Sequence, residues 1–96
     1  MRIEDLDDVT LDLDADGDEV RRTIGRRTWQ RGGWATIAIA YEQRAADGET
    51  WTRKLVLLRM QKLADGWRKH AAITMAGDDA LALASELPRW LTTAAS

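Results

Sequence analysis

The chain has 96 residues, which is enough for one small domain and too few for two. It contains no cysteine, so disulfide bonds and thiolate metal sites are excluded, and its acidic N-terminus without an apolar run predicts a cytoplasmic protein with no membrane segment. The net charge of −2 conceals an asymmetry, because residues 1–19 carry nine acidic side chains and one basic one, whereas residues 20–96 carry thirteen basic and seven acidic ones. An acidic leader on a basic body indicates either that the body binds an anionic partner or that the leader masks the body's positive charge.

The acidic leader, residues 1–19, contains one predicted strand. Apolar Val9, Leu11 and Leu13 alternate with polar residues, which is the period of a half-buried strand. The Asp-Gly pair of "ADGD" follows and predicts a hairpin turn.

The same turn resembles the start of an EF-hand calcium loop. Asp12, Asp14, Asp16 and Gly17 fit its first positions. Position 12 of such a loop needs a bidentate glutamate, but here it is Thr23. The sequence therefore favours an acidic hairpin turn, predicts no metal and no cofactor, and leaves calcium binding as an alternative.

The basic body is predicted to form antiparallel strands. Strand-like patterns cover residues 19–31, 34–44, 51–63 and 67–75. Turn signals separate them at Gly32-Gly33, "AADGE" and "ADG". Within the first pattern, Gly25 is expected to form a bulge or bend, and Ile24 is expected on the opposite face from Thr23 and Arg27.

The second of these strands has two different faces. Ile37, Ile39 and Tyr41 share one face, while small residues such as Ala38 and Ala40 occupy the other. Small side chains allow a close neighbour, so we expect a helix on that second face.

The apolar period changes to that of a helix after "AGDD". Leu83, Leu87, Trp90 and Leu91 recur at helical spacing and are expected to form a buried stripe, with Trp90 in the core. Asp78 is a candidate N-cap, and Asp79 suits the positive end of the helix dipole. The proline of "ELPRW" predicts either a kink or a stop near Leu87.

Together these elements predict an α+β fold: an antiparallel meander of four to five strands followed by a C-terminal helix packed on one face. A single domain covers residues 1–96. Its parts are an acidic leader with the first strand (1–19), a sheet (20–75) and a helix (78–94).

Enzymatic chemistry is not expected. The chain has one histidine, His70, and two serines, Ser85 and Ser96, without a nucleophile, zinc or phosphate-loop motif. A paired-carboxylate site would have to draw on aspartates that lie mostly in the leader. We therefore predict no catalytic residues and no small-molecule substrate.

Tryptophan is the dominant aromatic residue, and it stands beside basic residues. The motifs "RRTWQR", "WTRK" and "WRKH" place Trp29, Trp51 and Trp67 next to Arg or Lys, and Trp34 begins a strand. Bases of single-stranded nucleic acid stack on such rings while cations contact phosphates. The alternative is that these tryptophans close the edge of a small core.

The layout of four antiparallel strands and a helix resembles the PC4-like and Whirly single-stranded-DNA-binding domains. The strand "WTRKLVLL" (51–58) and the segment "KHAAITMAGDDALAL" (69–83) are similar to the lysine-containing strands and acidic helix start of the bacterial PC4-like proteins. This chain departs from the family at two places: "KHAA" stands where the family tends to have a lysine-glycine pair before its last strand, and the proline of "ELPRW" is expected to break the helix unusually. Purine-rich-element-binding (PUR) repeats share the layout and are an alternative resemblance.

The resemblance implies a homodimer with packed helices and sheets that bind single-stranded DNA or RNA. Stacking would fall to Trp29, Trp34, Trp51 and Trp67, and phosphate contacts to Arg27, Arg31, Arg53, Arg59, Lys62, Arg68 and Lys69. The acidic leader would compete for the basic face. The alternative function is a protein-interaction module, such as a small dimeric adaptor or inhibitor, that binds no nucleic acid.

Overall fold

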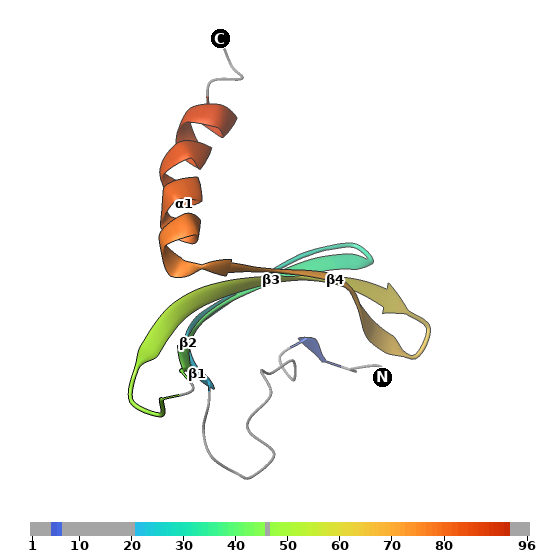
Figure 1. Ribbon diagram of the computed structural model, residues 1–96. Helices are drawn as coiled ribbons and strands as arrows, with labels where there is room; N and C mark the ends of the chain where they lie inside the picture. The colour runs from blue at the N-terminus through green and yellow to red at the C-terminus, as the bar shows by residue number, and fades with distance from the viewer. Residues whose placement is uncertain (1–4, 7–20, 46, 93–96) are drawn as a thin grey trace.

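The structure is a computed structural model that describes residues 5–6, 21–45 and 47–92. Four strands, β1 (Arg21–Arg31), β2 (Trp34–Arg44), β3 (Trp51–Leu63) and β4 (Gly66–Ala76), precede one helix, α1 (Gly77–Thr92). They form a single antiparallel sheet in the order β1-β2-β3-β4 (Figure 1). The predicted α+β meander with a C-terminal helix is confirmed, while the predicted strand at 9–13, its turn and the calcium alternative lie outside the described residues.

Short turns join the strands where the sequence predicts them. Gly32, with a φ of 57°, begins the two-residue turn between β1 and β2, a conformation that favours glycine. The turn between β2 and β3 is held by Asp47, whose Oδ1 accepts hydrogen bonds from the backbone N–H groups of Glu49 and Thr50 at 2.9 and 2.8 Å. Such Asx turns replace backbone hydrogen bonds with side-chain ones.

A bulge interrupts the pairing of β1 with β2. The register shifts between Thr23 and Gly25, which confirms the irregularity predicted at Gly25. The extra residue changes the alternation, so that Ile24 and Arg27 lie on the same face of the sheet. The expectation that they lie on opposite faces is wrong, because it assumed an uninterrupted period of two.

One face of the sheet carries the core, and we call it the core face. Ile37 and Ile39 are buried at its centre, with Tyr41 beside them, as their alternation predicts. Burial of each such side chain contributes about 1.5–3 kcal/mol. The full set of buried residues is Leu6, Ala35, Ile37, Ile39, Tyr41, Val56, Leu58, Met60 and Trp67.

One described residue of the leader, Leu6, packs on this core face. Leu6 belongs to the buried cluster, and the guanidinium of Arg26 donates a hydrogen bond to its carbonyl oxygen. Figure 1 shows this short segment on the side of the sheet opposite to α1. Part of the acidic leader is therefore a component of the fold.

Helix α1 lies on the face of the sheet that carries Ala38 and Ala40, as predicted, but it rises away from the sheet (Figure 1). None of its residues is buried. It is one continuous helix that contains Pro88, so it does not stop near Leu87. The described residues include no helix that is long and apolar enough to cross a membrane.

The predicted burial of Trp90 is wrong. This side chain is 55% exposed, because α1 contacts the sheet through its first turns only and Trp90 lies near its far end. Helical periodicity identifies an apolar stripe, but it does not show whether another element covers the stripe. Here the stripe is present, and within the described residues nothing buries it.

Candidate nucleic-acid interface

The strand registers determine which side chains share a face with α1, and we call this the helix-side face. Residues directly opposite each other in an antiparallel pair lie on the same face. Ala38 pairs with Arg27 on β1 and with Leu57 on β3, and Leu57 pairs with Ile73 on β4. These partners, together with every second residue along each strand, make up the helix-side face, and the alternation shifts by one residue at the bulges of β1 and β4.

The first group on this face surrounds the turn between β1 and β2, and we call it the hairpin cluster. The Arg59 guanidinium lies 4.8 Å from the centroid of the Trp34 ring and donates a hydrogen bond of 3.1 Å to Thr36 Oγ1. His70 meets Trp34 edge-on, with ring centroids 5.1 Å apart and planes at 89°. The members of the cluster are Arg27, Trp29, Arg31, Trp34, Arg59, Arg68 and His70.

Trp29 is the more accessible of the two tryptophans in the hairpin cluster. It is 52% exposed, and the guanidinium of Arg27 lies 5.8 Å from its ring centroid. Its position opposite Thr36 places it beside Trp34 and Arg59 on the helix-side face. Such an exposed ring can take up a planar ligand without unfolding any part of the sheet.

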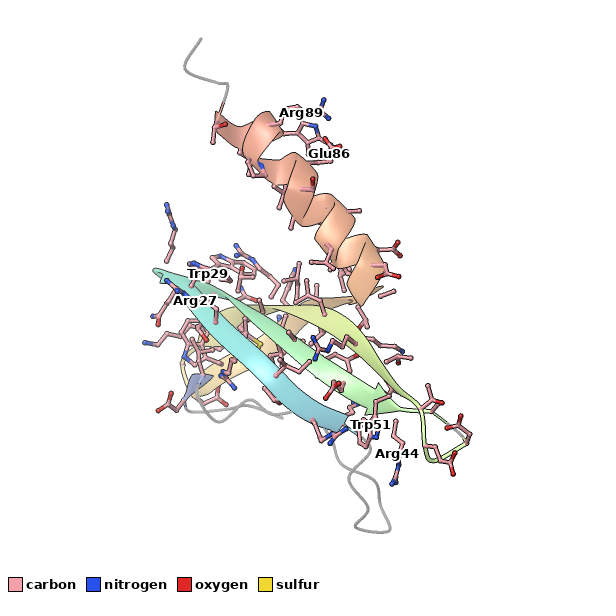
Figure 2. All side chains as sticks on the ribbon, turned by 90° about the vertical axis from the view of Figure 1, so that its left-hand side faces the viewer. Arg27, Trp29, Arg44, Trp51, Glu86 and Arg89 are labelled. Atoms are coloured by element: carbon pink, nitrogen blue, oxygen red, sulfur yellow. The ribbon has the colours of Figure 1, made fainter. Side chains whose placement is uncertain are left out.

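The second group surrounds the start of β3, and we call it the loop cluster: Arg22, Glu42, Arg44, Trp51 and Arg53. The guanidinium carbon of Arg22 lies 3.5 Å from the centroid of the Trp51 ring, and that of Arg44 lies 5.9 Å away. Glu42 Oε1 lies 3.8 Å from Arg22 Nη2, and its Oε2 lies 3.6 Å from Arg53 Nε. Figure 2 shows Arg27 and Trp29 at one end of the sheet and Arg44 and Trp51 at the other.

An apolar region separates the two clusters. Ala38, Leu57 and Ile73 pair across three strands at its centre, and Ala40, Leu55 and Met75 pair in the next row. Between this region and the first turns of α1 lies an open groove of about 720 Å³. Its apolar walls are Ile24, Ala40, Leu55, Ala76, Ala80, Leu81 and Ala84.

Charge on the helix-side face is predominantly positive. Within the described strands it carries seven arginines, and Glu42 is its only acidic residue. The two ion pairs of Glu42 are partly exposed, so each contributes only about 0–1 kcal/mol. Most of these guanidinium groups therefore remain available to an anion.

The structure brings together eight of the eleven residues proposed from the sequence. Trp29, Trp34 and Trp51 share the helix-side face with Arg27, Arg31, Arg53, Arg59 and Arg68. Trp67, Lys62 and Lys69 lie on the core face instead. Trp67 is 5% exposed in the core cluster, with Lys62 Nζ 6.0 Å from its ring centroid.

Arg22, Arg44, Glu42 and His70 belong to the two clusters but were not proposed from the sequence. Arg44 could have been found from its position beside the "AADGE" turn, whereas Arg22 meets the Trp51 ring only across β2, through the strand registers. His70 could not, because a bulge between the pairs Arg59–Ala71 and Met60–Lys69 places it against Trp34. Among the described residues, no group of three or more His, Asp or Glu side chains could hold a metal ion.

Comparisons with protein-family models, with curated proteins and with solved structures gave no match to this chain.

Proposed function

We propose that this protein binds single-stranded DNA or RNA on its helix-side face. The observation that supports the proposal is the gathering of three tryptophans and seven arginines on one face of a four-stranded sheet. A sheet that presents aromatic rings and cations suits unstacked bases and their phosphates. The bases of a duplex are stacked on each other, so their faces are not accessible to Trp29, Trp34 or Trp51.

The tryptophans provide stacking positions at both ends of the sheet. Trp29 is the primary candidate because of its exposure, and the rings of Trp34 and Trp51 are half-buried. Stacking of one base on an aromatic ring contributes roughly 1–3 kcal/mol and depends little on base identity. Recognition by this face is therefore expected to tolerate many sequences.

The arginines provide the contacts to phosphates. Arg31, Arg53 and Arg68 are exposed on the helix-side face, close to the rings that would hold bases. Trp34 and Arg44 mark the two ends of β2, which are about 30 Å apart at the rise of an extended strand. A single strand that contacts both clusters must span this distance.

The acidic leader is proposed to weaken binding by its charge. Leu6 of the leader packs on the core face, so the effect would be electrostatic repulsion of phosphates and would decrease as salt screens it. Deletion of residues 1–19 would also remove Leu6 from the core. The suitable variant replaces Asp12, Asp14 and Asp16 with Asn, and it should bind more tightly than the wild type at low salt.

The experiment is a titration of tryptophan fluorescence with oligo-dT of about 16 nucleotides at low and at high salt. We expect quenching with micromolar affinity at low salt, and a slope of log affinity against log salt that indicates several phosphate contacts. Trp29→Ala should weaken binding by about 1–3 kcal/mol. Arg31→Ala should weaken it and reduce the salt slope by about 0.7.

The matched control is Lys69→Ala, which removes an exposed cation from the core face. It should leave both affinity and slope close to those of the wild type. The proposal fails if oligo-dT causes no quenching and shows no salt-dependent binding at micromolar protein. It also fails if Lys69→Ala weakens binding as much as Arg31→Ala does.

A further inference from the structure

The open groove at the base of α1 has the size and lining of a small-molecule site. Its volume of about 720 Å³ lies within the roughly 300–1,000 Å³ that is typical of ligand sites. Ala40 and Leu55 of the sheet line it on one side, and Leu81 and Ala84 of α1 line it on another. Leu81 is 70% exposed, so an apolar occupant would cover surface that this chain leaves open to solvent.

The groove is shaped by the bulge of β1 and by the direction of α1. The bulge brings Ile24, which is 48% exposed, to the groove from the edge of the sheet. Leu81 and Ala84 are three positions apart on the helix, so they lie on the same side of it. Because α1 rises away beyond its first turns, the groove stays open along one side (Figure 1). Apolar walls on two elements suit one narrow chain better than a flat partner surface.

Positive charge gathers at one end of this groove. Arg53 lines the groove and also belongs to the loop cluster, which contains Arg22 and Arg44 as well. Glu42 is the carboxylate of that cluster, 3.6 Å from Arg53 Nε and 3.8 Å from Arg22 Nη2, so three guanidinium groups share one negative charge. Among the described residues that line the groove, Asp78 alone is acidic. An anionic group is therefore attracted to the Arg53 end.

We propose that this groove binds a soluble single-chain amphiphile with an anionic head, of the medium-chain carboxylate class. The hydrocarbon chain lies between Leu55 and Leu81, and the carboxylate accepts hydrogen bonds from the guanidinium of Arg53. Each methylene group that leaves water adds to the affinity. The inference does not rest on nucleic-acid binding, so it is tested with the full chain in the absence of any oligonucleotide.

The experiment is a calorimetric titration of the protein with sodium decanoate. Decanoate should bind with a dissociation constant on the order of 100 µM. Octanoate, which is shorter by two methylene groups, should bind about three- to tenfold more weakly. Decyltrimethylammonium carries a comparable chain on a positive head, and it should bind at least about tenfold more weakly than decanoate because Arg53 repels it.

Helix α1 offers a matched pair of variants for the apolar contact. Leu81 and Leu91 are each 70% exposed, but only Leu81 lines the groove. Leu81→Glu should weaken decanoate binding at least about tenfold, because it removes an apolar wall and repels the carboxylate. Leu91→Glu should change the affinity by less than about twofold. Both variants should keep the far-UV spectrum of the wild type, because neither side chain is buried.

Arg53 and Arg31 offer a second matched pair, for the charged contact. Both are exposed arginines of the helix-side face, but Arg31 lies at the opposite end of the sheet. Arg53→Gln should weaken decanoate binding about tenfold, and Arg31→Gln by less than about twofold.

Three results would overturn the proposal. The first is no binding of decanoate at about 1 mM. The second is equal affinity for decanoate and decyltrimethylammonium, which would show that the head group is not recognised. The third is an equal loss in Leu81→Glu and Leu91→Glu. That result would assign the binding to the exposed apolar side of α1 as a whole, as expected for a membrane or protein surface, and not to the groove.

Discussion

The Arg22 guanidinium lies on the ring of Trp51, 3.5 Å from the ring centroid, and Glu42 faces it from the neighbouring strand at 3.8 Å. This pair joins the start of β1 to the start of β3 across β2. The cation is thus held by a ring on one side and a carboxylate on the other. The arrangement fixes a charged group beside an aromatic plane before any ligand arrives.

Removal of the Arg22 side chain should destabilise the protein by a small, measurable amount. Arg22→Ala is expected to lower the free energy of unfolding by about 0.5–1 kcal/mol, as for an exposed cation–π contact. Urea denaturation followed by far-UV circular dichroism measures the change. Arg31→Ala, at an exposed position for which no ring contact is seen, should change stability by less, and equal losses in the two variants would contradict the proposed role of the Trp51 contact.

The turn between β2 and β3 should respond to acid through Asp47. Hydrogen bonds from the backbone and hydroxyl of Thr50, and then from the backbone of Glu49, lower the pKa of Asp47 from its ordinary 3.8 to about 2. A carboxyl with a lowered folded-state pKa stabilises the fold above its unfolded value, and this contribution is lost as pH falls through the folded value. The loss should therefore occur between about pH 4 and pH 2.

Asp47→Asn tests this pH dependence because it removes the titrating group. Asparagine has one acceptor oxygen, and its NH₂ group cannot accept the hydrogen bond that the Thr50 hydroxyl donates to Asp47 Oδ2. Urea midpoints at pH 6, 4, 3 and 2 should show the wild type more stable at pH 6, with the difference narrowing toward pH 2. A difference that does not change with pH would show that the Asp47 charge contributes nothing to the turn.

Gly77, at the junction between β4 and α1, should not tolerate a side chain. A Cβ atom added there would lie 3.0 Å from the backbone oxygen of Arg53 and 3.4 Å from its Cβ, and β3 is a central strand that cannot easily move. Gly77→Ala should lower the free energy of unfolding by about 1 kcal/mol, even though alanine favours a helix.

Gly25 provides the matched comparison, because an added Cβ there meets nothing within 4 Å. Gly25→Ala is expected to be neutral or stabilising by up to about 0.5 kcal/mol. The melting temperature should therefore fall for Gly77→Ala and should stay the same or rise slightly for Gly25→Ala. If Gly77→Ala is as harmless as Gly25→Ala, the close approach of the helix start to Arg53 does not limit the fold.

Pro88 should limit the helix content of α1. It lies within a continuous helix, where it cannot donate a backbone hydrogen bond and costs about 3 kcal/mol relative to alanine. Pro88→Ala should increase the circular dichroism signal at 222 nm. The outer half of α1 does not pack on its own sheet. The free energy of unfolding of the sheet should therefore change much less than the helix signal does. Ser85→Ala is the control and should leave the helix signal nearly unchanged.

The amino-acid sequence by itself determined the local structure of this protein. The alternation of Ile37, Ile39 and Tyr41 identified the core face, and turn residues such as Gly32 and Asp47 located the corners of the meander. The period of Leu83, Leu87 and Leu91 identified the helix. These features depend on neighbours within a few positions in the chain, so their patterns are visible in the sequence.

Only the tertiary structure decided which side chains meet. A bulge at Ile24 reversed the alternation of β1 and brought Arg27 to the helix-side face, while the register of β4 placed Trp67 in the core and Lys69 beside it. Equally, only the rise of α1 away from the sheet left Trp90 exposed. One inserted residue changes the face of every residue after it, and the direction of a helix depends on its junction, so neither outcome follows from the residue types alone.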